Sequence, residues 1–357
     1  MEAGWAEKYK KETTIIRTKM QWVLFIGTLF LLFSAPLFVS LYIASVCNRI
    51  AITIIACLGL QIVLGYCGQI NIGQAAFMAV GAYSWALLCL KLNFSVWLAI
   101  PVASIITSLI GMLFSLPAVR VKGFYLLLTT LTAHLLIIWI IATFETVTGG
   151  VVNGLHAPNV SIGKIVLRSD LESWLVVMPI LILMILVTKN IVRSRIGRAF
   201  VAIRDNEAAA TIMGINPFKY KVLAFAICTF YAGIAGSLWG ITQLYLHPDQ
   251  FDIMEGIWCL AVITVGGLGT IGGAVIGSIL MGILREGIIV VTPVVAKIIP
   301  GIGETVYAGA TYAFFGLILV LFLLFEPRGL WHRWERVRGT IRQWRFSGRF
   351  IKPINNI

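Results

Sequence analysis

Long apolar runs recur from one end of the chain to the other, separated by short polar segments. A helix that crosses a membrane needs about 20 mostly apolar residues, so each long run predicts a membrane-embedded helix. We expect these helices near 22–46, 50–66, 74–92, 95–118, 123–144, 173–188, 221–246, 256–270, 274–296 and 305–325. The pattern predicts an all-α polytopic membrane protein with about ten transmembrane helices. Eight helices would also fit if 50–92 formed one broken hairpin.

Composition leaves little room for anything besides this membrane domain. Of the 357 residues, 59% are hydrophobic and 12% are charged, whereas an ordinary soluble domain has about 25% charged residues. We therefore divide the chain into an N-terminal segment (1–20), one transmembrane domain (21–327) and a basic tail (328–357). The 189–221 loop belongs to the transmembrane domain.

Basic residues are concentrated in the polar segments, which predicts an orientation. The 189–221 loop carries seven Lys or Arg residues against two acidic ones, and the tail from Arg328 carries eight against one. The 247–255 loop instead holds three acidic residues and no basic one. Because Lys and Arg in short loops face the cytoplasm, we expect the 189–221 loop and both termini there. This distribution explains the net charge of +13 without nucleic-acid binding, and the tail, rich in Trp and Arg, is expected to contact anionic lipid.

Motifs for cofactors, metals and nucleophilic catalysis lack the context that they need. Residues 267–272 spell a dinucleotide fingerprint, but their flanks read as membrane helices and not as a βαβ unit. Gly163-Lys164 lacks the other residues of a phosphate-binding loop. The four histidines and six cysteines show no metal-ligand spacing. We expect neither a bound cofactor nor an enzymatic activity in this chain.

Acidic residues are nearly absent from the middle of the apolar runs, the exception being Glu286 beside Arg285. Carriers driven by proton or sodium gradients usually use buried carboxylates for coupling. Energy for transport is therefore expected to come from outside this chain. The alternative is a secondary carrier or a passive channel, which would transport solute when reconstituted alone.

Two glycine-rich breaks, 65–74 and 266–273, interrupt the apolar pattern and share the motif G-x-x-x-I-G-x-A. Irregular backbone at membrane depth is tolerated only where it is buried in protein or lines a polar cavity. The breaks supply candidate residues for a translocation path: Gln69, Asn71, Gly73, Gln74, Gly269 and Gly272. Their amide side chains either bind a passing zwitterion or satisfy the backbone groups that the break frees.

Thr130 and His134 add polar groups to one predicted helix. They are four residues apart and so share a face of that helix. Either they line the same path, or they pack against a neighbouring helix as hydroxyl-bearing residues often do in membranes.

The segment 193–225 is polar and mostly basic, and it lies between two apolar runs. Within it, residues from Glu207 to Met213 favour a short helix that Gly214 and Pro217 stop. A membrane protein that gathers charge into one internal loop usually presents it to a cytoplasmic partner. We expect this helix to be a docking element.

Six blocks of the sequence together resemble a known family. They are GQINIGQAAFMAVGAY (68–83), GFYLLLTTLTAHL (123–135), VTGG with NGL (147–155), IGRAFVAIRDNEAAATIMGINPFKYKVLAF (196–225), GGLGTIGGAVIG (266–277) and FEPRGL (325–330). In this order they are similar to the permeases of branched-chain amino acid ABC transporters, specifically the LivM-type subunit. The resemblance covers about residues 20–330. Permeases for urea and short-chain amides are close relatives and remain an alternative.

This resemblance implies a subunit of the bacterial inner membrane with a fold like that of type II ABC importers. It also implies partners: a homologous permease of the LivH type, two cytoplasmic ATPases that bind ATP and Mg²⁺, and a periplasmic solute-binding protein. The matching loop positions imply a role in ATPase coupling for Arg198, Arg204, Asp205, Asn206, Glu207 and Gly214. Glu207-Ala208-Ala209 is similar to the EAA motif of importer permeases, although Gly214 comes one position later than that motif expects.

Overall fold

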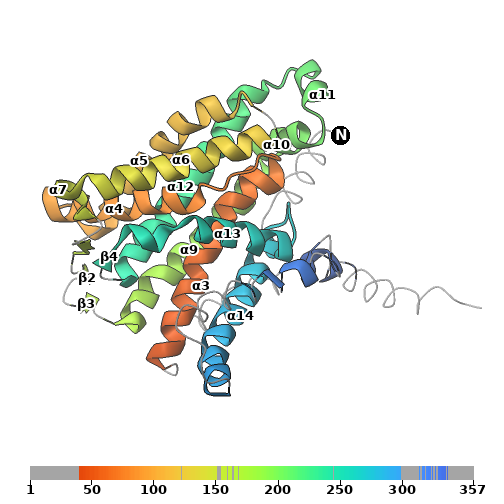
Figure 1. The fold of residues 1–357 in the computed structure, drawn as a ribbon. Helices are drawn as coiled ribbons and strands as arrows, with labels where there is room; N and C mark the ends of the chain where they lie inside the picture. The colour runs from red at the N-terminus through yellow and green to blue at the C-terminus, as the bar shows by residue number, and fades with distance from the viewer. Residues whose placement is uncertain are drawn as a thin grey trace, which may run out of the picture.

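The computed structural model is a bundle of long helices (Figure 1). It describes residues 40–298 except 122, 151–153, 159, 163–164, 168 and 244, together with scattered residues between 313 and 336. The predicted helix at 22–46 lies mostly outside the described residues, as do the N-terminal segment, most of the helix at 305–325 and most of the tail.

Nine long or medium helices make up the described bundle and its internal loop. Their bounds are α3 (Leu41–Leu60), α4 (Gln74–Leu92), α5 (Val96–Ala118), α6 (Phe124–Thr143), α9 (Asp170–Arg193), α10 (Arg195–Asp205), α12 (Pro217–Gln243), α13 (Ile253–Gly266) and α14 (Ile271–Ile298). Short helices complete it: the π-helical turn η2 (Gln61–Tyr66), α7 (Glu145–Thr148), α11 (Glu207–Ile212) and the 3₁₀ turn η3 (Pro248–Phe251).

Within the described ranges, seven helices are long and apolar enough to cross a membrane. This confirms an all-α polytopic membrane protein, while the count of ten stays a prediction. One boundary is wrong: we expected a break between 46 and 50, but α3 runs through it and continues into η2 as far as Tyr66. Arg49 lies within this continuous helix, where its side chain pairs with Glu286.

Helix α12 lies at the centre of the bundle and packs against α5, α4 and α3. Glycines allow these helices to approach closely, as small residues do in membrane proteins generally. A Cβ added to Gly236 would lie 1.9 Å from the carbonyl oxygen of Met78 on α4, and one added to Gly233 would lie 2.7 Å from the Cα of Ser104 on α5. The backbone of α12 is therefore in direct contact with both neighbours.

Both predicted breaks are present. The first ends η2 and leaves residues 67–73 irregular before α4, and the second separates α13 from α14 over residues 267–270. Gly68, Gly267 and Gly269 have positive φ values (71°, 121° and 76°), which glycine adopts without strain. With only 14 residues, α13 is too short to span a bilayer alone, so our prediction of a spanning helix at 256–270 is not met.

Ion pairs connect α14 to two other helices, on the stretch of each that lies away from the second break and from α10. The guanidinium of Arg49 on α3 lies 2.6 Å from Glu286, and Arg285 lies 2.5 Å from Glu255 on α13. Arg285 also covers the ring of Trp258 at 5.1 Å. Adjacent residues of α14 thus bind different helices, which explains how two charges are accommodated in one apolar run.

Short strands lie at the end of the bundle opposite α10 and α11 (Figure 1). Strand β1 (Leu155–His156) pairs antiparallel with β4 (Tyr245–Leu246), so that Leu155 faces Leu246. Strands β2 (Val160–Ile162) and β3 (Ile165–Leu167) form a hairpin before α9. The β1–β4 pair connects the loop after α7 to the turn η3, and it places that turn near α6.

The close contact between Gly236 on α12 and the backbone of Met78 on α4 leads to a prediction about stability. Gly236→Ala should destabilise the protein by about 1–3 kcal/mol, because the new methyl group collides with backbone that cannot move freely. Gly287→Ala on α14 is the matched control, since no atom lies within 4 Å of its added Cβ and alanine favours the helix by about 0.5–1 kcal/mol. Thermal unfolding in detergent, followed with a dye that reacts with buried thiols such as Cys57, measures both. Equal shifts would contradict the packing described for α12.

Candidate coupling and translocation site

The polar segment after α9 folds into two helices and not into one helix and a loop. We expected only the helix at 207–213, and it is present as α11, which Gly214 terminates with φ +82°. Residues 195–205, which we read as loop, form α10. Its apolar face (Ala199, Phe200 and Ile203) is buried, and Ser194 caps its first turn by accepting from the backbone N–H of Ile196.

Arg204 extends from the end of α10 to both glycine breaks. Its Nη1 donates a hydrogen bond of 2.8 Å to the carbonyl oxygen of Gly65. The same nitrogen would lie 3.1 Å from a Cβ added to Gly269, and the arginine stem would lie 2.9 Å from one added to Gly68. Two hydrogen bonds to Asp205 orient the guanidinium. A residue of the predicted docking loop is thus wedged between the two breaks.

Loop and break residues also line one cavity of about 270 Å³. From the loop come Arg204, Asp205, Asn206 and Glu207, and from the first break come Cys67, Gly68, Gln69 and Ile70. Burial raises the pKa of the Cys67 thiol to about 12, with Lys221 opposing and Glu207 adding to the shift, so the thiol stays neutral. The structure therefore brings four of the six predicted coupling residues together with Gln69.

Glu207 and Asn206 stabilise the start of α11. The carboxylate of Glu207 lies 2.9 Å from Nζ of Lys221 on α12, whose side chain is only 3% exposed. Asn206 caps the helix by accepting from the backbone N–H of Ala209. Because a buried lysine without its partner is costly, Glu207 has a structural role as well as any role in docking.

The far end of α11 is different in character, because it exposes apolar side chains. Ile212 is 86% exposed and Met213 is 81% exposed. Gly214, which follows them, has no atom within 4 Å of an added Cβ. Arg198, the sixth coupling candidate, is also exposed, and within the described part of the chain its side chain donates to the carbonyl oxygen of Arg193. This tip of the loop contacts little else among the described residues.

The amides of the first break are bonded within the protein. Gln74 is fully buried, donates to the carbonyl oxygen of Ala56 at 2.9 Å and accepts from the thiol of Cys228. Asn71 is also fully buried and accepts from the backbone N–H of Gly73. Gln69 is partly exposed and donates weakly to the carbonyl oxygen of Cys67. For Asn71 this contact favours the second alternative, in which amides satisfy freed backbone groups, whereas Gln74 attaches the break to helices α3 and α12.

The sequence analysis does not single out Gln61, whose side-chain amide forms hydrogen bonds with backbone groups of the second break. It is fully buried in the π-helical turn, and its Nε2 donates to the carbonyl oxygens of Gly267 and Thr270 at 3.0 and 2.9 Å. A polar residue inside the apolar run at 50–66 was the available signal. Because π turns recur at functional positions, this turn is a further element of the site.

The remaining path candidates lie in two different surroundings. The hydroxyl of Thr130 accepts from the backbone N–H of Ile72, so it attaches α6 to the first break. Gly73 also faces α6, with its added Cβ 3.0 Å from the carbonyl oxygen of Thr130. Gly272 instead packs against the indole of Trp331, which would lie 2.2 Å from an added Cβ. Their roles in a path stay predictions.

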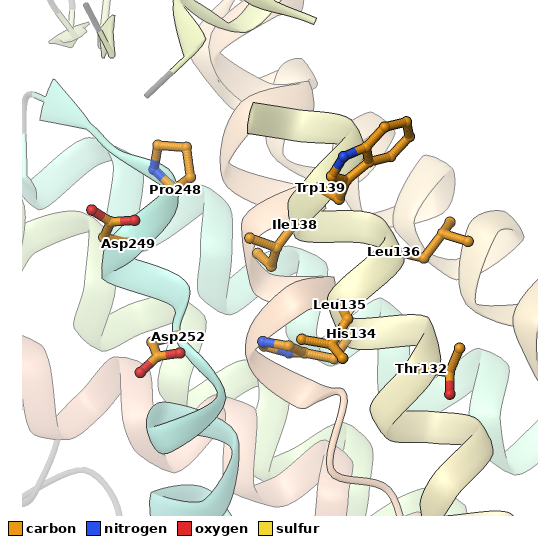
Figure 2. A pocket seen from close by; sticks show the side chains of 9 residues that line it. All are labelled: Thr132, His134, Leu135, Leu136, Ile138, Trp139, Pro248, Asp249 and Asp252. Atoms are coloured by element: carbon orange, nitrogen blue, oxygen red, sulfur yellow. The ribbon is translucent and has the colours of Figure 1, made fainter. Parts of the chain in front are cut away.

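His134 lies apart from the breaks, in the wall of a second and larger cavity of about 860 Å³ (Figure 2). The opposite wall is formed by Pro248, Asp249 and Asp252, around the turn η3 and the start of α13. The sequence predicts only that these acids mark an external loop; the structure places them opposite α6. Asp252 directly precedes the short apolar helix α13 and is its N-cap. An acidic residue at the start of an apolar run was the feature of the sequence that could have singled it out.

Comparison with known proteins identifies the class of protein. The family described as branched-chain amino acid transport system / permease component matches residues 42–323. The chain belongs to this family. The resemblance noted from its six sequence blocks is thereby confirmed, and the chain is a multi-pass membrane protein. No solved structure matches it.

Curated members of the family are similar over much of their length. The chain is 28% identical to the high-affinity branched-chain amino acid transport system permease protein LivM of Salmonella typhimurium, an alignment that covers 70% of this chain but 64% of that protein. LivM of Escherichia coli is also 28% identical, over 75% and 69%. A shorter match of 29% identity covers 27% of this chain and belongs to the ribose import permease protein RbsC of Escherichia coli.

The contacts of Arg204 with both breaks lead to a second prediction. Arg204→Met should destabilise this permease by about 1–3 kcal/mol, because the buried carbonyl group of Gly65 loses its charged donor. Arg198→Met, on the same helix, is the control and should change stability by less than about 0.5 kcal/mol. The thiol-reactive dye reports directly here, since Cys67 lies in the same cavity. If both variants unfold at the same temperature as the wild type, Arg204 does not hold the break.

Proposed function

We propose that this chain is the membrane-spanning permease subunit of an ATP-driven ABC importer for branched-chain amino acids. It pairs with a homologous permease of the LivH type in the bacterial inner membrane, with both termini in the cytoplasm. Two cytoplasmic ATPases bind ATP and Mg²⁺, and a periplasmic binding protein delivers the solute. Membership of the family and the relatives named LivM support this assignment.

The observation that carries the mechanism is the position of Arg204. Its helix α10 leads through Asn206 directly into α11, whose far end exposes Ile212 and Met213. Exposed apolar residues at the tip of a polar loop fit a protein partner. A partner that moves α11 would pull on Arg204 and therefore on the carbonyl group of Gly65 and on the second break. The loop thus couples the ATPases to the irregular segments within the membrane.

One observation bears on the identity of the solute. The match to a ribose permease shows that related sequences serve different solutes, and a urea or short-chain amide permease is the second candidate. Urea and amides are uncharged, whereas the larger cavity contains two carboxylates. This charge favours a solute with a cationic group, such as an amino acid.

Reconstitution tests the assignment as a whole. In vesicles, the lone chain should neither hydrolyse ATP nor accumulate leucine, even under a proton or sodium gradient. Addition of the second permease, both ATPases and the binding protein should produce leucine uptake that requires ATP. Accumulation driven by a gradient in vesicles that contain only this chain would replace the importer with a secondary carrier. Uptake of urea but not of leucine would select the amide permease.

A substitution at the tip of α11 tests the docking role without disturbing the ion pair of Glu207. Ile212→Asp should leave the permease folded, because the side chain is 86% exposed. It should abolish most of the ATP hydrolysis that loaded binding protein stimulates, since a charge would enter an apolar interface at a cost of about 2–5 kcal/mol. Ile212→Leu keeps the side chain apolar and should retain wild-type stimulation. Full stimulation in Ile212→Asp would show that α11 does not dock the ATPase.

A further inference from the structure

The larger cavity has walls of two kinds. On one side α6 contributes apolar side chains, among them Leu135, Ile138 and Trp139. On the other side the turn η3 and the start of α13 contribute Asp249 and Asp252, and Figure 2 shows the His134 ring and the Asp252 carboxylate extending toward each other. The cavity therefore combines an apolar wall with a polar corner.

The polar corner is negatively charged. No Lys or Arg is among the described residues that line the cavity. One oxygen of Asp252 accepts the backbone N–H of Ile253 at 2.6 Å, which fixes the carboxylate at the start of α13. Asp249 lies farther out, 79% exposed and 3.3 Å from Nδ1 of His247. Asp252 is therefore the better-defined anionic group of the two.

His134 provides an independent sign that a ligand group belongs here. The residue is only 2% exposed, and its Nδ1 has no hydrogen-bond partner within the described part of the chain. A buried polar atom without a partner is rare, because it loses its hydrogen bonds to water without replacement. The imidazole and the carboxylate of Asp252 lie on opposite sides of the cavity (Figure 2), so one donor placed between them would serve both groups.

The chemistry of the corner selects the kind of ligand. A metal ion would need more ligands: within the described residues, no group of three or more His, Cys, Asp or Glu is arranged to hold one. A neutral solute would leave the carboxylate uncompensated. An organic ammonium group fits better, since it carries a positive charge and several N–H donors. The apolar wall beside it fits an aliphatic group.

We propose that Asp252 and His134 form the subsite that binds the α-ammonium group of a branched-chain amino acid during its passage. The carboxylate of Asp252 accepts the ammonium hydrogens, and an imidazole nitrogen accepts another. The branched side chain lies against Leu135, Ile138 and Trp139, and the carboxylate of the solute points away from Asp252. This subsite rests on the proposed function and adds the residues that distinguish an amino acid from a neutral amide.

Two probe molecules separate the features of leucine. 3-Methylbutylamine keeps the branched chain and the ammonium group, whereas 4-methylpentanoate keeps the branched chain and the carboxylate. Binding of each is measured by calorimetry on the permease pair with its ATPases in lipid nanodiscs, without the binding protein. The amine should bind and the acid should not. Equal binding of both, or binding of the acid alone, would overturn the subsite.

Asp252→Asn removes the charge and keeps the helix cap, because asparagine caps a helix as well as aspartate. It should weaken amine binding at least about tenfold. His134→Phe should weaken it several-fold. Glu145→Gln is the control, since this exposed carboxylate does not line the cavity, and it should bind the amine as the wild type does. Unchanged amine binding in Asp252→Asn, with wild-type thermal unfolding, would overturn the proposal.

Transport by the complete complex separates this proposal from the function on which it rests. Asp252→Asn should lower ATP-dependent leucine uptake, while loaded binding protein still stimulates ATP hydrolysis. If the wild-type complex takes up no leucine, the proposed function fails, and the amine still tests the subsite. If the wild type takes up leucine and Asp252→Asn takes it up equally fast, the function stands and the subsite is wrong.

Discussion

Backbone groups freed at the two glycine breaks must find hydrogen-bond partners inside the protein, because lipid offers none. Side chains from distant parts of the chain supply them. Gln61 donates to the carbonyl groups of the second break and Arg204 to that of Gly65 in the first. Gln74 attaches the start of α4 to the carbonyl group of Ala56 on α3. The breaks, the π turn and the loop helix α10 are therefore one hydrogen-bonded unit.

Much of this arrangement follows from local sequence rules. Apolar runs placed α4, α5, α6 and α14 to within a few residues, since length and hydropathy alone decide them. Clustered glycines revealed both breaks because few other residues adopt positive φ there. The continuity of α3 through Arg49 is not predictable in this way, because the ion pair to Glu286, 237 positions away, is invisible in a local pattern. The hydrogen-bond partners of Gln61 and the position of Asp252 opposite α6 were equally out of reach, since tertiary packing alone determines them.

Charge in this protein is placed where it can be compensated. Arg49 with Glu286, and Arg285 with Glu255, form pairs at the end remote from the loop, and Lys221 pairs with Glu207 beside it. Between these ends the long helices bury mostly apolar, small or hydroxyl-bearing residues. Asp252 differs from the paired acids, because it caps a helix and faces a cavity instead of a cation.

The contact of Gly272 with Trp331 has a consequence for biosynthesis. Gly329 also packs on this break, with its added Cβ 2.4 Å from the Cα of Gly267. The second break is thus covered by residues that the ribosome makes well after α14. During synthesis the break is inserted with its backbone uncovered, and it reaches its final packing only when residues 329–331 fold back onto it. The packing of this break therefore depends on residues that follow α14 in the chain, and it cannot be complete until they have been synthesised.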